Sequence, residues 1–181
     1  MNYKRTNNIV VLLDTSGSMV PHGLWAITCL ATFVHKVRYV VLFSDKVSVV
    51  KLSRTRSNRL IIQFLKTILG SGFRGNTDMV SALKEVNKIP LPGKYTLVII
   101  SDLKHNMPGD PVPLVRSLVN RLSRFIVITP VNHNHVLAEE VRSLGGEVFI
   151  VKSPLEIPCI LKKRLNLKTS LVKERKRLSI K

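Results

Sequence analysis

The chain has 181 residues, 45% hydrophobic and 22% charged, with a formal net charge of +18 at pH 7. This length and balance fit one domain with a sizeable core and exclude a chain that is disordered throughout. Its two cysteines, Cys29 and Cys159, lie in apolar surroundings, which favours a reduced, intracellular protein over a secreted disulfide-bonded one. The longest apolar stretch, residues 23–34, is too short to span a bilayer. Polar residues 1–8 do not look like a secretory signal, so we expect a cytoplasmic protein without membrane contact.

Short apolar runs alternate with helical patterns along the chain. The first half predicts a strand over 9–13 that ends at Asp14, a buried helix over 20–37, strands over 38–43 and 46–52, and a helix over 58–69. Residues 44–45 fit a hairpin turn, so one edge strand is expected to be antiparallel. The second half predicts helices over 77–88, 111–123, 135–144 and 155–165, and strands over 95–100, 125–129 and 147–151.

This alternation predicts an α/β fold with three αβα layers, Rossmann-like and doubly wound. Its sheet is expected to be mainly parallel and six-stranded, with one antiparallel edge strand. In such open sheets, ligands bind beyond the carboxyl ends of the strands, at the switch point of strand order. Asp14 and Asp102 each end a predicted apolar strand, so we expect the functional site at that edge.

One polar motif carries the chemistry. Asp14, Ser16 and Ser18 stand in alternate positions of a turn between strand and helix, and Gly17 permits that turn to be tight. Hard divalent cations such as Mg²⁺ prefer oxygen ligands in octahedral geometry. Thr77 and Asp102 offer two further oxygens, so the predicted metal ligands are Asp14, Ser16, Ser18, Thr77 and Asp102. Each alone also fits a helix cap or a polar strand end, whereas their joint occurrence favours a metal site.

The combination of Asp-x-Ser-x-Ser, a later Gly-x-Thr-Asp and an Asp at a strand end resembles the metal-ion-dependent adhesion site, or MIDAS, of von Willebrand factor type A (VWA) domains. The resemblance covers approximately residues 8–165, including the order of the elements. It implies that the five residues bind a cation directly or through water, and that an acidic side chain of a partner completes the coordination. Residues 101–130 also look like the intracellular CoxE-like branch, which implies partnership with a MoxR-type AAA+ ATPase.

The sequence therefore predicts a binding module in which a cation captures a Glu or Asp of a partner protein. Two hydroxyls and few carboxylates favour Mg²⁺ or Mn²⁺ over Ca²⁺. We expect no enzymatic activity, because a metal-dependent hydrolase needs a general base or a second metal, and no His or Glu accompanies the motif. The glycine-rich residues 70–75 also lack the lysine of a phosphate-binding loop. In a weaker alternative, the metal only stabilises a subunit of an assembly.

The C-terminal residues differ in character. We divide the chain into a VWA domain over 1–165 and a basic tail over 166–181, in which Leu167, Leu171 and Leu178 could form one face of a basic helix. The tail and the net charge of +18 suggest an alternative function, a nucleic-acid-associated basic protein. A solvated terminus is equally compatible with this composition.

Four further residues lie near the motif in sequence. Asp78 is expected to stabilise a helix N-terminus and Asp110 to cap a turn. His22 and His105 could rim the metal site, but we expect both to be ordinary loop histidines.

Overall fold

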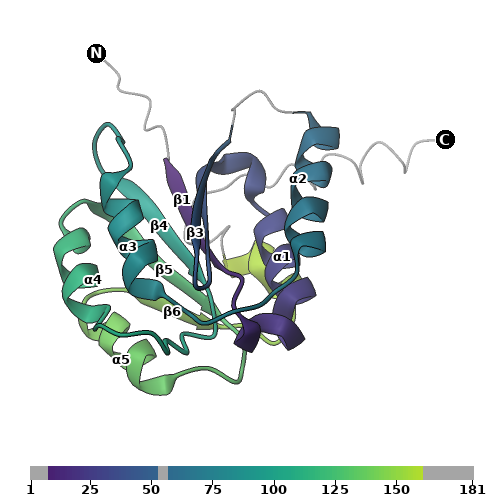
Figure 1. Ribbon diagram of the computed structural model, residues 1–181. Helices are drawn as coiled ribbons and strands as arrows, with labels where there is room; N and C mark the ends of the chain where they lie inside the picture. Colours follow the sequence, from purple (N-terminus) through teal and green to yellow (C-terminus); the bar gives the residue numbers. More distant parts are fainter. Residues whose placement is uncertain (1–7, 53–56, 161–181) are drawn as a thin grey trace, which may run out of the picture.

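The computed structural model describes residues 8–52 and 57–160 (Figure 1). Six strands form one sheet in the order β3-β2-β1-β4-β5-β6. They are β1 (Ile9–Asp14), β2 (Val37–Phe43), β3 (Val47–Lys51), β4 (Tyr95–Ile100), β5 (Leu122–Thr129) and β6 (Glu147–Ile150). β3 pairs antiparallel with β2, and every other pairing is parallel. The predicted fold class, with its antiparallel edge strand, is confirmed.

Helices cover both faces of the sheet (Figure 1). One face packs against α1 (Gly23–Ala31) and α2 (Asn58–Ser71), and the other against α3 (Met79–Lys88), α4 (Val112–Val119) and α5 (His135–Ser143). Three short 3₁₀ helices complete the described elements: η1 (Gly17–His22), η2 (Val34–Lys36) and η3 (Pro154–Glu156). The described chain is therefore a three-layer αβα structure.

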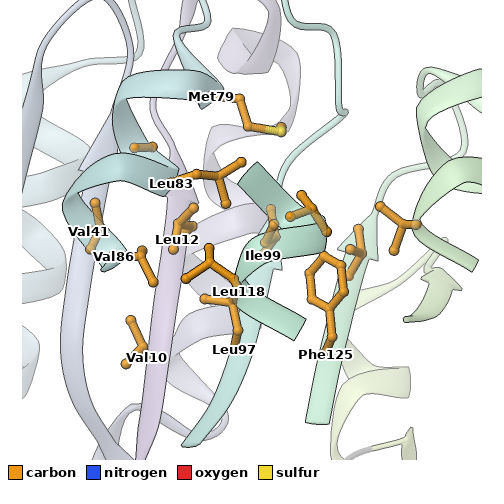
Figure 2. Packing of buried hydrophobic residues seen from close by; sticks show 14 of the residues in the cluster. Val10, Leu12, Val41, Met79, Leu83, Val86, Leu97, Ile99, Leu118 and Phe125 are labelled. Carbon is orange, nitrogen blue, oxygen red and sulfur yellow. The ribbon is translucent and has the colours of Figure 1, made fainter. Parts of the chain in front are cut away.

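The central strand β1 is buried on both faces, which explains why it is apolar at five consecutive positions. Ile9, Val11 and Leu13 belong to the core cluster beneath α1. Val10 and Leu12 point to the opposite face and pack with residues of α3 and β4, as Figure 2 shows. This alternation follows from the two-residue period of a strand.

The predicted helix over 20–37 is wrong at both ends. The segment divides into η1, α1 and η2, and Val37 already belongs to β2, where it pairs with Ile9. Pro21 stands before α1, and the hydroxyl of Thr32 donates to the carbonyl of Cys29 just beyond its end. Because the segment is apolar nearly all round, periodicity alone could not locate these boundaries.

The predicted helix over 111–123 is too long, because α4 ends at Val119 and β5 begins at Leu122. Pairing of Leu122 with Tyr95 in β4 extends β5 by three residues beyond the predicted start of this strand at 125. For the last predicted helix, over 155–165, η3 occupies the beginning and residues 157–160 are helical. Residues 161–165 and the basic tail lie outside the described residues.

The order of the strands decides where the site lies. From β1 the chain moves outward to β2 and β3, then returns to the other side of β1 with β4. The direction of winding therefore switches between β1 and β4, whose carboxyl ends carry Asp14 and the Ser101–Asp102 pair. In the described part of the chain, no helix has both the length and the apolar character needed to cross a bilayer.

Candidate metal centre

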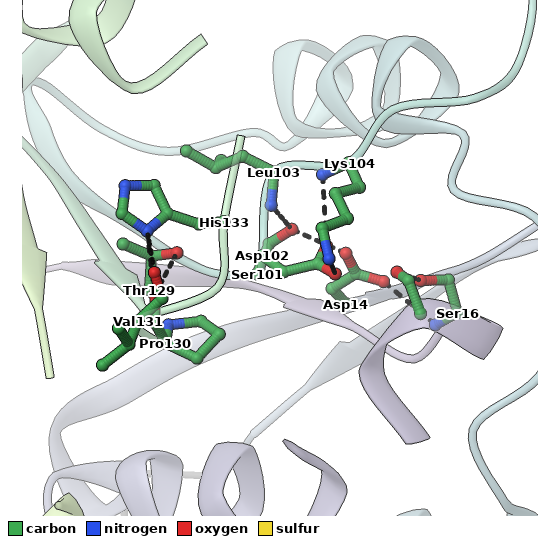
Figure 3. A network of polar contacts seen from close by, with 11 residues as sticks. Asp14, Ser16, Ser101, Asp102, Leu103, Lys104, Thr129, Pro130, Val131 and His133 are labelled. Atoms are coloured by element: carbon green, nitrogen blue, oxygen red, sulfur yellow. Dashed lines mark hydrogen bonds and ion pairs between the residues drawn. The ribbon is translucent and has the colours of Figure 1, made fainter. Parts of the chain in front are cut away.

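Asp14 is the last residue of β1, and its side chain is fully buried. One carboxylate oxygen accepts a hydrogen bond from the backbone N–H of Ser16 at 2.9 Å. The other accepts the hydroxyl proton of Ser101 at 2.6 Å, as Figure 3 shows. Ser101 in turn accepts the backbone N–H of Leu103 at 2.8 Å. Asp14 is thus held rigidly by the end of its own strand and by the end of β4.

The two serines of the motif lie together, and their hydroxyl oxygens share a hydrogen bond of 3.1 Å. Ser16 occupies the N-cap position of η1, but its side chain makes no capping hydrogen bond. The helix-cap alternative is therefore not realised at Ser16. Its hydroxyl is instead directed toward that of Ser18 in the first turn of η1.

Two backbone hydrogen bonds join the loop after β1 to the loop before α3. The N–H of Gly17 donates to the carbonyl of Gly75 at 2.9 Å, and the N–H of Arg74 donates to the carbonyl of Thr15 at 2.8 Å. A Cβ atom on Gly17 would lie 3.2 Å from the carbonyl oxygen of Gly75, and Gly75 has a φ of 80°. Glycine at both positions therefore permits a close approach that brings Thr77 to this edge of the sheet.

Thr77 is held by its backbone, and its hydroxyl makes no hydrogen bond with the described residues. Its N–H donates to the side-chain oxygen of Asn106 at 2.7 Å, and its carbonyl oxygen lies 2.8 Å from Nδ1 of His105. The side chain is 1% exposed, and among the described residues Oγ1 has no hydrogen-bond partner. Thr77 thus presents a buried, unpaired oxygen instead of capping a helix.

Asp102 presents a second such oxygen. Its side chain is fully buried, and Oδ1 accepts the backbone N–H of Lys104 at 3.1 Å. Oδ2 has no hydrogen-bond partner among the described residues, and the ammonium group of Lys104 lies 3.6 Å from it (Figure 3). Among the described residues, no other ion pair involves either of the buried aspartates, Asp14 and Asp102.

The two carboxylates influence each other electrostatically. The pKa of Asp14 is raised above its ordinary value, chiefly because burial removes the ionised carboxylate from water. Hydrogen bonds from Ser101 and Ser16 oppose this rise, and the negative charge of Asp102 adds to it. A cation bound between the two aspartates would offset both the burial and the repulsion.

These features fit a divalent cation with oxygen ligands. Buried polar atoms almost always make hydrogen bonds, so oxygens on both Thr77 and Asp102 that make none with the described residues require an explanation. The site supplies carboxylates from two aspartates and hydroxyls from three further residues, which is the donor chemistry that Mg²⁺ and Mn²⁺ prefer. The predicted ligands Asp14, Ser16, Ser18, Thr77 and Asp102 thus lie at the ends of β1 and β4 and in the segments beside them, and their role as ligands remains a prediction.

The neighbouring residues have separate roles. Asp78 caps α3, because its side chain accepts the N–H of Ser81 at 2.9 Å, and Asp110 accepts the N–H of Val112 at 2.9 Å. Both predictions are confirmed. His22 makes an edge-on ring contact with Trp25, whereas the ring of His105 lies against the backbone of Thr77.

Three residues of the site were missed as participants by sequence reasoning. Ser101 hydrogen-bonds Asp14, Asn106 holds the backbone of Thr77, and Lys104 pairs with Asp102. Only Ser101 carried a signal, since it adjoins a predicted ligand at a strand end. The other two act across a turn whose path the sequence does not specify.

Solved structures share this fold. A protein described as an aerotolerance-related membrane protein from Bacteroides fragilis, with multiple mutations to serines, is 16% identical with a TM-score of 0.69, over 88% of this chain and 98% of that one. The conserved hypothetical protein BatB from Bacteroides thetaiotaomicron is 14% identical with a TM-score of 0.68, over 88% and 97%. Proximal thread matrix protein 1 from the mussel byssus, with a zinc-occupied MIDAS motif, is 19% identical with a TM-score of 0.61, over 86% and 46%.

At these identities the likenesses show the fold alone. No curated protein matches the chain significantly. A sequence profile of the family described as "VWA domain containing CoxE-like protein" matches residues 2–150, which is most of the chain. Together with the αβα sheet and its strand order, this match shows that the chain belongs to the family of VWA domain containing CoxE-like proteins.

Proposed function

We propose that this chain is a metal-dependent protein-binding module that captures an acidic side chain of a partner protein. The observation that carries the proposal is the pair of buried oxygens, Thr77 Oγ1 and Asp102 Oδ2, that have no hydrogen-bond partner among the described residues. Asp102 lies close enough to the fully buried carboxylate of Asp14 to raise its pKa, and Thr77 follows the loop that Gly17 hydrogen-bonds. A site that leaves such atoms without a hydrogen bond is suited to a ligand that supplies a positive charge.

Each residue has a distinct role in this proposal. Asp14 and Asp102 supply the negative charge that holds the cation. Ser16, Ser18 and Thr77 supply neutral oxygens, so the protein adds no negative charge beyond that of the two aspartates. Ser101 is a positioning residue, because its hydroxyl fixes one carboxylate oxygen of Asp14. The cation, when bound, offers a coordination position to a carboxylate of the partner.

The donor set favours Mg²⁺ or Mn²⁺. All five side chains bind through oxygen, and none is a thiolate or an imidazole, the ligands that Zn²⁺ and Cu²⁺ prefer. Ca²⁺ usually takes more carboxylate oxygens than two aspartates supply. A zinc-occupied MIDAS motif in the mussel protein supports divalent metal binding by this fold in general.

An acidic partner fits both the site and the whole chain. A carboxylate that reaches the cation completes its coordination, and the net charge of +18 attracts acidic surfaces over a longer distance. Within this proposal, the finer identification is a MoxR-type AAA+ ATPase, which rests on the likeness to the CoxE-like branch. We place the module in the cytoplasm, because both cysteines, Cys29 and Cys159, are free thiols.

We further propose that the site binds and does not catalyse. General acid–base chemistry needs a group such as His or Glu within hydrogen-bond reach of the reacting atoms. In residues 8–52 and 57–160, neither Asp14 nor the two motif serines hydrogen-bond a His or Glu side chain.

The test compares Asp14→Asn with Asp110→Asn. Both change one carboxylate to an amide, but Asp110 is exposed and only caps a turn. Mn²⁺ titration followed by electron paramagnetic resonance should show one site in the wild type and in Asp110→Asn, and its loss in Asp14→Asn. A pull-down from native lysate should then retain a protein with Mg²⁺ and release it with EDTA. Retention that survives both EDTA and Asp14→Asn would refute capture through the metal, and the identity of the retained protein tests the ATPase assignment.

A further inference from the structure

Lys104 covers the carboxylate of Asp102 from the solvent side. Its backbone N–H donates to Oδ1 at 3.1 Å, and its ammonium nitrogen lies 3.6 Å from Oδ2, the oxygen without a hydrogen-bond partner (Figure 3). The side chain of Asp102 has no exposed area, whereas that of Lys104 is 41% exposed. One residue therefore contacts both oxygens of a predicted metal ligand and still reaches the surface.

The backbone between these two residues is strained in a way that fixes this arrangement. Leu103 has a φ of 61° and is the only non-glycine residue with a positive φ in the described part of the chain. Its side chain is fully buried, and its N–H donates to the hydroxyl of Ser101. A left-handed conformation is unfavourable for leucine, so it persists only where the surrounding contacts enforce it. This turn places Lys104 back over Asp102.

The ammonium group and a divalent cation compete for the same oxygen. A cation held by Asp102 would repel the ammonium of Lys104 from Oδ2, because like charges at this distance oppose each other in a partly buried site. The displaced ammonium would stay tethered near the surface. A ligand carboxylate that completes the coordination of the cation would then give the ammonium group a new negatively charged partner in place of Asp102.

We propose that Lys104 makes the metal site selective for an acidic ligand. Its ammonium group opposes binding of the metal alone and pairs with the carboxylate of the acidic ligand once the metal is bound. Lys104 thereby couples the two binding events, so that metal and acidic ligand favour each other. This inference rests on the proposed function, because it requires both a metal at Asp102 and a carboxylate ligand.

The experiment compares Lys104→Gln with Lys94→Gln and Lys104→Arg. Lys94 is an exposed residue before β4, at the opposite end of that strand, and its substitution removes the same charge. Mn²⁺ affinity is measured by electron paramagnetic resonance, and acetate binding to the Mn²⁺-loaded protein by relaxation of the acetate methyl protons. Lys104→Gln should bind Mn²⁺ about two- to fivefold more tightly than the wild type and acetate about two- to fivefold more weakly, the range for a partly exposed ion pair. Lys94→Gln should bind Mn²⁺ and acetate as tightly as the wild type. Lys104→Arg keeps the positive charge, so its affinities for Mn²⁺ and acetate should stay close to those of the wild type.

Three results would overturn the inference. Equal Mn²⁺ affinities in Lys104→Gln and Lys94→Gln would show that the ammonium does not oppose the metal. Unchanged acetate affinity in Lys104→Gln would show that the ammonium does not meet the ligand. Either result leaves the proposed function intact if the wild type binds Mn²⁺ and Asp14→Asn does not. Failure of the wild type to bind Mn²⁺ overturns both the proposed function and the role of Lys104.

Discussion

Thr77 and Asp102 each bury an oxygen atom that has no hydrogen-bond partner among the described residues. A buried polar atom left unpaired costs about 1–3 kcal/mol of stability. The turn at Leu103 adds backbone strain directly beside Asp102. Side chains at the switch point are thus arranged at a cost to the stability of the metal-free protein, which is typical of a binding site.

We expect Thr77→Val to separate stability from metal binding. Valine matches the shape of threonine and removes the unpaired hydroxyl, so in EDTA the variant should be as stable as the wild type, or more stable by up to about 1 kcal/mol. Its Mn²⁺ affinity should fall by about tenfold or more, as for a lost charge-assisted contact worth roughly 1.5–3 kcal/mol. Thermal melting in EDTA and Mn²⁺ titration check the two halves. A marked loss of stability of Thr77→Val in EDTA would mean that the hydroxyl of Thr77 stabilises the fold of the metal-free protein.

The raised pKa of Asp14 predicts two opposite pH dependences. The pKa of the Asp14 carboxyl is higher in the folded protein than in the unfolded chain. This group therefore stabilises the folded protein most below its unfolded pKa, and that contribution is lost as the pH rises through the folded pKa. In EDTA, stability should therefore fall over that range in the wild type but not in Asp14→Asn. Mg²⁺ affinity should instead rise with pH, since the cation binds the ionised carboxylate and releases a proton. Melting curves and calorimetry from pH 4 to 8 measure both, and equal pH profiles for wild type and Asp14→Asn in EDTA would contradict the prediction.

At the scale of elements, the strands were easier to predict than the helix ends. β4 has the bounds that its apolar run predicts, because Tyr95–Ile100 is buried at every position. The starts of β2 and β5 depend instead on pairing with neighbouring strands, as between Val37 and Ile9 and between Leu122 and Tyr95. Tertiary pairing therefore overrides local periodicity where apolar character is continuous.

Two glycines, one inside a helix and one in the turn before a strand, should respond oppositely to substitution by alanine. Gly70 lies inside α2, and a Cβ atom there would meet nothing within 4 Å. Gly70→Ala should raise stability by about 0.5–1 kcal/mol, because alanine restricts the unfolded chain and favours the helix. Gly146, before β6, has the carbonyl oxygen of Val141 2.8 Å from such an atom. Gly146→Ala should lower stability by about 1–3 kcal/mol. Urea denaturation measures both, and a destabilised Gly70→Ala would show that α2 needs flexibility at this position.

At the scale of the whole molecule, the net charge of +18 plays no part in building the core. The described core is built from apolar residues on both faces of the sheet, so the charge does not determine the fold. Charge acts at longer range, by attracting acidic partners or nucleic acid. The metal site and the basic tail could thus serve different ligands in the same chain.

Deletion of residues 166–181 tests the alternative function. This segment contains six basic residues and one acidic residue. If the tail binds nucleic acid, the truncated chain should bind a 20-base-pair duplex at least about tenfold more weakly at low salt, with a shallower salt dependence, because fewer phosphates are neutralised. Asp14→Asn should bind the duplex like the wild type. Fluorescence anisotropy at several salt concentrations measures both, and unchanged binding after truncation would exclude the tail as the binding element.

The fold class and the five candidate ligands could be predicted from the amino-acid sequence. Apolar runs that end at Asp14 and Asp102 predict a parallel sheet with both aspartates at one edge, since carboxyl ends of parallel strands share that edge. Local patterns were enough for these predictions, because buried strands are visible as apolar runs and the candidate ligands as oxygen-bearing residues in a recognisable spacing.

The contacts that hold the candidate ligands in place could not be predicted without the folded structure. Ser101 reaches Asp14 across 87 positions of the sequence, and Asn106 reaches Thr77 across 29. The strained turn at Leu103 brings Lys104 back onto Asp102. Such contacts depend on which strands lie side by side and on the path of a single turn, and no local pattern of residues encodes either.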